Sequence, residues 1–198
     1  MTLVVGVGGT TRPSSTSECA LRVALDGARE SGAETICLVA SDLDLPHYDP
    51  KAGTRTPAQT RLVEAFRAAD GVIVSSPGYH GAISGLVKNA LDHAEDLVDD
   101  DRVYFSDLPI GCIGVAYGGQ AAVSVMAGLR QIAHALRGFP TPYGAAVVAS
   151  PTVFAEGRCV DPAVTASLHL VGRQVATLAD RLRVPATVAD VLDPAGVR

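Results

Sequence analysis

Several features that would each indicate a particular class of protein are missing from this sequence. It has no tryptophan, and its four cysteines form no CxxC pair and have no nearby histidine at metal-ligand spacing. Zinc and thioredoxin-type sites are therefore not indicated. No apolar run approaches the roughly 18–20 residues of a membrane span. The net charge of −5 argues against nucleic acid or an anionic membrane as a partner.

The cysteines and the start of the chain indicate a reducing compartment. Cys37 and Cys112 fall in apolar, strand-like runs, whereas Cys159 lies in a loop. We expect all four, including Cys19, to be free thiols, and most of them buried. The N-terminal residues lack the basic region and apolar stretch of a signal peptide. The sequence therefore predicts a soluble cytoplasmic protein that binds neither membranes nor nucleic acid.

Short Val- and Ile-rich runs alternate with amphipathic stretches along the chain. With 198 residues, 47% of them hydrophobic, the chain can build one sizeable core. The alternation predicts a doubly wound α/β domain over residues 1–183, with five parallel strands and helices on both faces, followed by a tail at 184–198. The expected strands are 3–8, 34–40, 71–76, 109–116 and 142–149. The expected helices are 17–31, 57–69, 84–98, 119–137 and 162–182.

The segment between the first expected strand and helix is rich in glycine and hydroxyl groups. It reads Gly6-Val-Gly-Gly-Thr-Thr-Arg-Pro-Ser-Ser-Thr-Ser17. Free backbone N–H groups and partial positive charge at a helix start suit an anion. Hydroxyls add neutral donors, and Arg12 adds a forked cationic one. The segment predicts a site for a terminal phosphate that is held and not transferred.

Three other interpretations of this loop were weighed. A Walker loop needs Gly-Lys-Ser/Thr, and the segment has no lysine. A dinucleotide fingerprint needs a third glycine where Thr11 stands, and the acidic Asp42 lies 36 positions beyond Gly6 instead of about 20. An ordinary serine-rich helix cap needs only one hydroxyl. The phosphate loop is the favoured interpretation.

Two further loops follow the third and fourth expected strands. The first contains Ser75-Ser-Pro-Gly-Tyr-His-Gly-Ala-Ile-Ser84, in which Pro77 and Gly78 predict a sharp turn. His80 could serve as a general base, although no nucleophile accompanies it. The second contains Tyr117-Gly118-Gly119 at the start of a helix, which would stabilise negative charge on a bound ring. Because loops at the carboxyl ends of parallel strands share one edge, the three loops predict one site.

Together these segments resemble the NAD(P)H-dependent FMN reductase family, which has a flavodoxin-like fold. The resemblance rests on Gly9–Ser17, on the specific stretch Ser76–Asp92, on the Gly118-Gly119 turn and on Leu45-Pro-His-Tyr-Asp-Pro50. It extends to about residue 150. The departures are Thr10 for Ser, Gly78 where Glu is frequent, and Ala82 for Ser. The resemblance implies a three-layer sandwich with strand order 2-1-3-4-5.

The resemblance also implies which residues hold the cofactor. Those expected at the FMN phosphate are Thr10, Arg12, Ser15, Thr16 and Ser17. Those expected along the ribityl chain and ring are Pro77, Gly78, Tyr79, His80 and Gly81, with Ser84 and Gly85 at the ring edge. Tyr117, Gly118 and Gly119 are expected on the pyrimidine side. No metal site is expected, and the flavin itself performs the redox step, with His80 as the only candidate catalytic side chain.

The resemblance implies a flavoprotein that takes hydride from NADPH or NADH onto FMN. It would supply reduced flavin to a monooxygenase or reduce a small acceptor. The alternatives are an FMN-dependent quinone or azo-type reductase, and a flavodoxin-like electron carrier with no nicotinamide substrate. Family membership also implies a homodimer or homotetramer, with the arm Tyr48–Pro57 and the third helix as candidate contacts.

Overall fold

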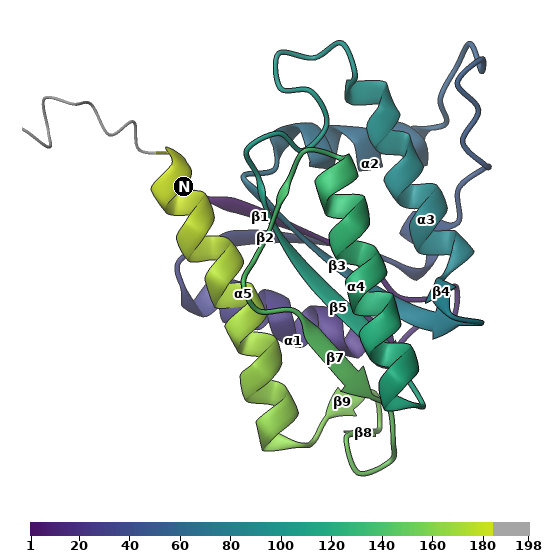
Figure 1. The fold of residues 1–198 in the computed structure, drawn as a ribbon. Helices are drawn as coiled ribbons and strands as arrows, with labels where there is room; N and C mark the ends of the chain where they lie inside the picture. The colour runs from purple at the N-terminus through teal and green to yellow at the C-terminus, as the bar shows by residue number, and fades with distance from the viewer. Residues whose placement is uncertain (184–198) are drawn as a thin grey trace, which may run out of the picture.

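A parallel sheet lies at the centre of the structure, a computed structural model whose described residues are 1–183 (Figure 1). The spatial order of its strands is β2-β1-β3-β5-β6, and β7 also pairs with β5. All these pairings are parallel. The strands are β1 (Leu3–Gly8), β2 (Glu34–Val39), β3 (Gly71–Tyr79), β5 (Pro109–Ala116), β6 (Phe139–Pro140) and β7 (Ala145–Val148).

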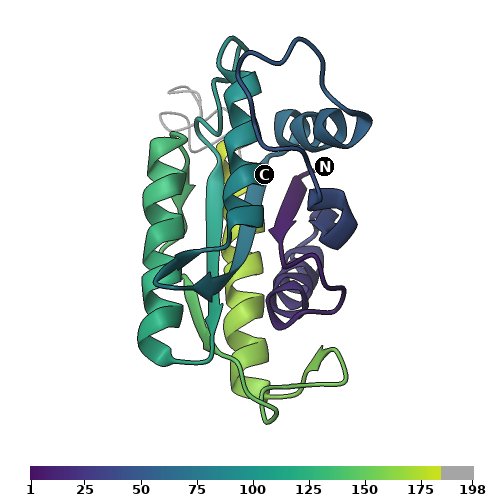
Figure 2. The same cartoon turned by 90° about the vertical axis from the view of Figure 1, so that its right-hand side faces the viewer.

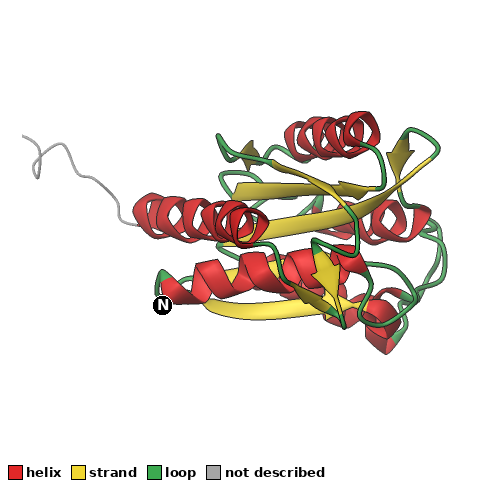
Figure 3. Ribbon diagram, turned by 90° about the horizontal axis from the view of Figure 1, so that it is seen from below, coloured by secondary structure: helices red, strands yellow, loops and turns green. Residues whose placement is uncertain are grey.

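Helices cover both faces of the sheet, which produces three layers (Figures 2 and 3). On one face, α1 (Thr16–Glu30) and α5 (Pro162–Arg183) bury a core that includes Leu21 and Val171. On the other face lie α2 (Pro57–Ala68), α3 (Gly85–Asp92) and α4 (Gly119–Ala135). There Phe66 meets Phe105 edge-to-face, with ring centroids 4.9 Å apart. The predicted α/β sandwich and strand order are confirmed.

The predicted fifth strand, 142–149, contains only the shorter strand β7, and the short strand β6 precedes it. β6 and β7 both pair with β5, on either side of residues 141–144. Pro142 lies in that gap and has no backbone N–H to donate to a ladder, which accounts for the interruption. The predicted helix 84–98 is also divided. It ends as α3 at Asp92 and continues as the 3₁₀ turn η2 (His93–Leu97).

The turn after the third strand does not lie where the sequence suggested. Pro77 and Gly78 remain inside β3, so the prediction of a sharp turn there was wrong. The chain reverses at His80-Gly81, where φ is +50° and +86°, and returns as β4 (Ala82–Ile83). Positive φ at both central residues is what a two-residue hairpin of type I′ requires.

Three smaller elements were not predicted. Ala40–Leu43 form the 3₁₀ turn η1 after β2. Beyond β7, the strands β8 (Phe154–Ala155) and β9 (Arg158–Cys159) form an antiparallel hairpin. The predicted tail, 184–198, lies outside the described residues. Within residues 1–183, no helix combines the length and hydropathy needed to cross a membrane.

All four cysteines are free, as predicted, but only Cys19 and Cys112 are buried. Burial raises the pKa of the Cys112 thiol to about 12. The expectation of burial was wrong for Cys37, which is only half-buried because β2 is an edge strand of the sheet. Cys159, predicted in a loop, lies in β9 and is also half-buried.

The arm 48–57 is fastened to η2 by one acidic side chain. Asp96 accepts hydrogen bonds at 2.7 Å from both Nε and Nη2 of Arg55, and at 3.2 Å from the Tyr48 hydroxyl. The Arg55 guanidinium also lies 4.9 Å from the centre of the Tyr48 ring. The side chains of Arg55 and Asp96 are only 19% and 20% exposed. These contacts fasten the arm to η2.

The hydrogen bonds from Arg55 lower the pKa of Asp96 below its ordinary value of 3.8. A depressed carboxyl pKa stabilises the fold above that value, and the contribution is lost as the pH falls through the folded-state pKa. At neutral pH we expect Asp96→Asn to lower the free energy of unfolding by about 1–2 kcal/mol. Urea unfolding at a series of pH values should show this deficit shrinking in acid.

The matched control is Asp92→Asn, one turn earlier, whose exposed carboxylate pairs with Lys88. An exposed pair of this kind contributes less, about 0.5 kcal/mol. A deficit for Asp96→Asn that is equal at neutral and acid pH would contradict the assigned role of the ionised carboxylate.

Candidate functional site

A cleft of about 120 Å³ lies at the carboxyl ends of β1, β3 and β5. The parallel register aligns these ends, since Gly8 is opposite Ser75 and Ser76 is opposite Gly114. The loops that leave the three strands therefore meet at one edge of the sheet. The cleft is lined by Thr10, Arg12, Ser15, Thr16, Ser17, Pro77, Gly78, Tyr79, Val115, Ala116, Tyr117 and Ala149.

The first wall is the loop 9–17, hereafter the phosphate loop. Its two ends are bonded to β3 through Ser75. Gly9 N–H donates to the Ser75 carbonyl at 3.2 Å, and the Ser75 hydroxyl donates to the Ser17 carbonyl at 2.8 Å. Within the loop, the Arg12 N–H donates to the Thr10 hydroxyl at 3.1 Å. Ser15 caps α1, because its hydroxyl accepts from Glu18 N–H at 3.3 Å.

Some hydrogen-bond donors of this loop are available to a ligand. Within residues 1–183, the backbone N–H groups of Thr16 and Ser17 have no protein acceptor. Arg12 is exposed, and the ion pairs of this part of the chain do not include it. Free N–H groups at a helix start beside a guanidinium form a site for an anion.

One buried carboxylate lies beside these donors. Glu18 accepts from Ser14 N–H at 2.9 Å and from Arg22 Nε at 2.9 Å, and its side chain is only 6% exposed. The carboxylate fixes Ser14, whose φ is +57°. Arg22 balances the charge of Glu18, so the loop can still attract an anion.

The second wall is the end of β3. Tyr79 lines the cleft and is 52% exposed. Two neighbours of this wall are structural. The buried hydroxyl of Ser76 accepts from Ser84 N–H at 2.9 Å, and the Ser84 hydroxyl caps α3 by accepting from Val87 N–H at 3.2 Å. Ser84 is thus buried and lies outside the cleft lining.

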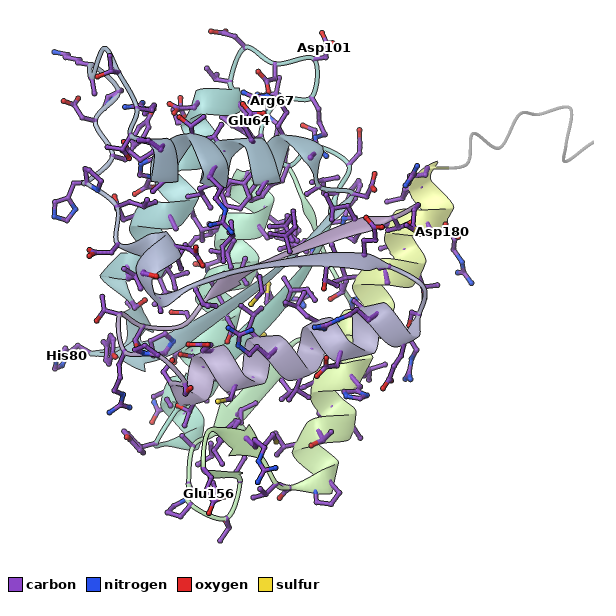
Figure 4. All side chains as sticks on the ribbon, turned by 180° about the vertical axis from the view of Figure 1, so that it is seen from behind. Glu64, Arg67, His80, Asp101, Glu156 and Asp180 are labelled. Atoms are coloured by element: carbon purple, nitrogen blue, oxygen red, sulfur yellow. The ribbon has the colours of Figure 1, made fainter. Side chains whose placement is uncertain are left out.

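Gly78 contributes to the wall through its backbone. A Cβ at this position would lie 3.0 Å from Val125 Cγ2 and 3.2 Å from Ala116 Cβ. The space behind the wall is therefore filled by α4 and β5. His80 and Gly81, by contrast, form the exposed tip of the hairpin, and His80 points away from the body of the protein (Figure 4).

The third wall follows β5. Tyr117 lines the cleft and is 89% exposed, and Gly118 and Gly119 lie next to it outside the lining. Gly118 is the N-cap of α4 and provides no side-chain cap, so the first N–H groups of α4 lack a side-chain acceptor. This is a second positive helix end directed at the same edge of the sheet.

The structure thus gathers most of the predicted residues into one cleft. Thr10, Arg12, Ser15, Thr16, Ser17, Pro77, Gly78, Tyr79 and Tyr117 line it, whereas His80, Gly81, Ser84, Gly118 and Gly119 do not. Sequence reasoning missed Val115, Ala116 and Ala149. Ala149 N–H bonds to the Ala116 carbonyl at 2.8 Å, which joins the ends of β5 and β7. These small apolar residues resemble any core strand, so only the register of the sheet could have identified them.

The chemistry of the cleft is that of an anion site next to an apolar and aromatic surface. Within residues 1–183, no group of His, Cys, Asp or Glu side chains is arranged to hold a metal ion. The residues could hold a phosphorylated ligand, with the phosphate on Arg12 and the start of α1 and a flat group near Tyr79 and Tyr117.

Comparisons of sequence and fold relate this chain to known flavin oxidoreductases. The family described as "NADPH-dependent FMN reductase" matches residues 2–152. The FMN-dependent NADPH-azoreductase of Staphylococcus aureus is 40% identical over 81 residues, which are 41% of this chain and 39% of the azoreductase. The match therefore spans less than half of that relative.

Two solved structures share the fold. FerB, a flavoenzyme NAD(P)H:(acceptor) oxidoreductase from Paracoccus denitrificans, superposes with a TM-score of 0.71 at 21% identity, covering 91% of this chain and 98% of FerB. An NADH:FMN oxidoreductase, EmoB, superposes with a TM-score of 0.69 at 20% identity, covering 94% of each chain. Since the family match covers most of the chain, the protein belongs to the NADPH-dependent FMN reductase family of flavin oxidoreductases.

Proposed function

We propose that this chain binds FMN in the cleft, with NADPH or NADH as reductant, and that it reduces a small acceptor. The observation that carries the proposal is the union of an anion site and an open aromatic surface at one edge of the sheet. When bound, FMN supplies the redox chemistry, so the protein needs only to bind, orient and shield it.

The phosphate end of the cleft fits the terminal phosphate of FMN. Arg12 supplies a forked cation, and Thr16 and Ser17 supply free backbone N–H groups. The side chains of Thr10 and Ser15 line the same space. These neutral and cationic donors match the oxygens of a phosphate monoester.

The other end of the cleft leaves room for a flat ring. Within residues 1–183, and leaving aside the flanking residues and the local helix backbone, nothing lies within 4 Å of a Cβ built on Gly81, Gly85 or Gly118, and at Gly119 only Val148 does, at 3.9 Å. The exposed rings of Tyr79 and Tyr117 offer apolar surface beside this space. The start of α4 would favour negative charge on the group bound there.

The structure assigns His80 no interaction that supports proton transfer. It is exposed at the tip of the β3–β4 turn and lies outside the cleft lining. His80 is therefore the weaker candidate for a catalytic role, which its substitution would test. We propose that the phosphate loop and the glycine-rich turns bind the cofactor.

The identity with the azoreductase supports an azo- or quinone-type acceptor over release of free reduced flavin. Delivery of reduced FMN to a partner monooxygenase is the other role that the family implies. The two differ in a measurable way, since delivery requires the flavin to leave the protein during each cycle.

We further propose that the active form is a homodimer or homotetramer. The cleft of about 120 Å³ is well below the roughly 300 Å³ at which ligand pockets begin. Exposed apolar side chains surround it, among them Tyr117, Val123 and Val148. A second copy seated over this edge would enclose the remainder of the flavin.

The purified protein should oxidise NADPH or NADH only when FMN is present, and faster when an azo dye or quinone is added. Absorbance of the reduced nicotinamide measures the rate, and reactions without flavin are the control. Flavin that exchanges freely with added FMN during turnover would favour delivery to a monooxygenase. If the protein binds FMN but neither nicotinamide bleaches it, the chain is an electron carrier and the proposed activity is wrong.

Arg12→Ala should weaken FMN binding by about 1.5–3 kcal/mol, because a hydrogen-bonded partner of the phosphate is lost. Riboflavin, which has no phosphate, should bind equally well before and after the change. Arg29→Ala, at the far end of α1, removes the same charge and serves as control. Titration of flavin fluorescence measures the affinities of all three proteins for FMN and for riboflavin. Equal affinities of the unmodified protein for FMN and riboflavin would refute the assignment of the phosphate loop.

Light scattering after size-exclusion chromatography should give a mass of two or four chains in the presence of FMN. The expected reason is that partner residues complete the cleft. A monomer that binds FMN and oxidises NADPH at full rate would contradict the proposed assembly.

A further inference from the structure

The β8–β9 hairpin packs against the outside of the phosphate loop. Its residues, 154–159, lie beyond the family match, which ends at residue 152. The Cys19 thiol on α1 donates to the Gly157 carbonyl at 3.0 Å. A Cβ built on Gly157 would lie 3.4 Å from Ser14 Cβ, which is van der Waals distance, so the turn of the hairpin lies next to the loop.

The contact falls on a strained residue. Ser14 has a φ of +57°, which lies in the left-handed region that residues other than glycine seldom adopt. Its N–H is held by the Glu18 carboxylate at 2.9 Å, and its carbonyl lies 3.6 Å from the Cys19 sulfur. The thiol has one proton, and the shorter contact to Gly157 takes it. Ser14 is exposed to solvent, but Glu18 and Cys19 contact its backbone, and Gly157 of the hairpin lies beside it.

Ser14 directly precedes the donors of the phosphate site. Ser15 is the N-cap of α1, and Thr16 and Ser17 carry the free N–H groups. The left-handed turn at Ser14 sets the direction in which the chain enters the helix. A change in the backbone conformation of Ser14 would change the direction in which the N–H groups of Thr16 and Ser17 point.

The hairpin is itself firmly anchored. Phe154 is buried in the core that α1 and α5 share, and Val160 N–H bonds to the Val153 carbonyl at 2.8 Å. At the start of α5, the Thr165 hydroxyl donates to the Asp161 carbonyl at 2.9 Å and lies 3.4 Å from the Cys159 sulfur. Its position is therefore fixed by contacts other than those to the phosphate loop.

The hairpin contacts the phosphate loop through its backbone, including the Gly157 carbonyl, and its charged side chains are exposed to solvent. Glu156 and Arg158 pair with each other at 3.5 Å, with side chains 85% and 77% exposed. Figure 4 shows Glu156 at the outer tip of the hairpin. Burial raises the pKa of the Cys19 thiol, so it keeps its proton and remains a donor at neutral pH.

We propose that the β8–β9 hairpin is a positioning element for the phosphate site: Gly157 and Cys19 together hold Ser14 in its left-handed conformation and so direct Ser15, Thr16 and Ser17 at the phosphate. The inference rests on the proposed binding of FMN. It assigns a function in cofactor binding to a segment that lies outside the lining of the cleft.

Two variants test the contact from its two sides. Gly157→Ala introduces a side chain at φ of +72° and against Ser14, and Cys19→Ala removes the donor. Each should weaken FMN binding by about five- to tenfold, because the loss of one hydrogen bond, or backbone strain of similar energy, changes affinity by about that factor. Riboflavin affinity should not change. Cys19→Ser, whose hydroxyl can donate to the same carbonyl, should restore FMN affinity.

Two controls separate positioning from other causes. Gly32→Ala, at the far end of α1, imposes the same strain at φ of +88° with no atom within 4 Å, and it should leave both affinities unchanged. Arg158→Ala removes the only cation of the hairpin and should also have no effect. Weaker FMN binding by Arg158→Ala would mean direct contact with the phosphate and would overturn the positioning role.

Hydrogen exchange in the flavin-free protein tests the inference without relying on FMN. Amides of residues 14–18 should exchange faster in Gly157→Ala than in the unmodified protein and in Gly32→Ala. Unchanged exchange, or an equal loss of FMN and riboflavin affinity, would overturn the proposal. If the unmodified protein does not prefer FMN to riboflavin, the proposed function fails instead, whatever the exchange shows.

Discussion

Two consecutive buried serines hold the parts of the cleft together. Ser75 receives the Gly9 N–H on its carbonyl and donates its hydroxyl to Ser17, which fixes both ends of the phosphate loop to β3. Ser76 accepts from Ser84 N–H and donates to the Pro77 carbonyl, which fixes the start of α3 and the end of β3. Both are fully buried, so an unpaired hydroxyl or carbonyl there would carry a desolvation cost of roughly 1–3 kcal/mol. The arrangement of the phosphate loop relative to the β3 edge depends on these bonds.

Because these bonds are internal, the cleft can leave its own donors unpaired. Among the residues that the structure describes, the N–H groups of Thr16 and Ser17 and the start of α4 have no protein acceptors at this edge. If protein acceptors bound these N–H groups, the groups could not donate hydrogen bonds to an anion. The rigid sheet and the two helix starts therefore provide a preorganised electrostatic environment, which suits a cofactor whose charge changes during the reaction.

The sequence predicted those features that local patterns determine. Runs such as Leu3–Gly8 and Pro109–Ala116 are continuous and apolar, so both the strands and their burial by two helix layers followed from composition. The strand order and the FMN residues came from family resemblance. The features that sequence reasoning missed depend on contacts that a local pattern does not specify. The turn at His80-Gly81 requires the pairing of Tyr79 with Ala82, and the contact of Cys19 with Gly157 joins residues 138 positions apart.

Gly78 shows how packing behind the cleft limits what the cleft can become. A glutamate is frequent at this position in the family that the sequence resembles, yet a Cβ here would approach Val125 to 3.0 Å and Ala116 to 3.2 Å. Both neighbours are buried, in α4 and at the end of β5, and neither is the end of a long flexible side chain. A larger residue would therefore require Val125 on α4 and Ala116 on β5 to shift by a few tenths of an ångström. In this chain the wall at Gly78 is backbone alone, and the exposed side chains that line the cleft beside it are those of Tyr79 and Tyr117.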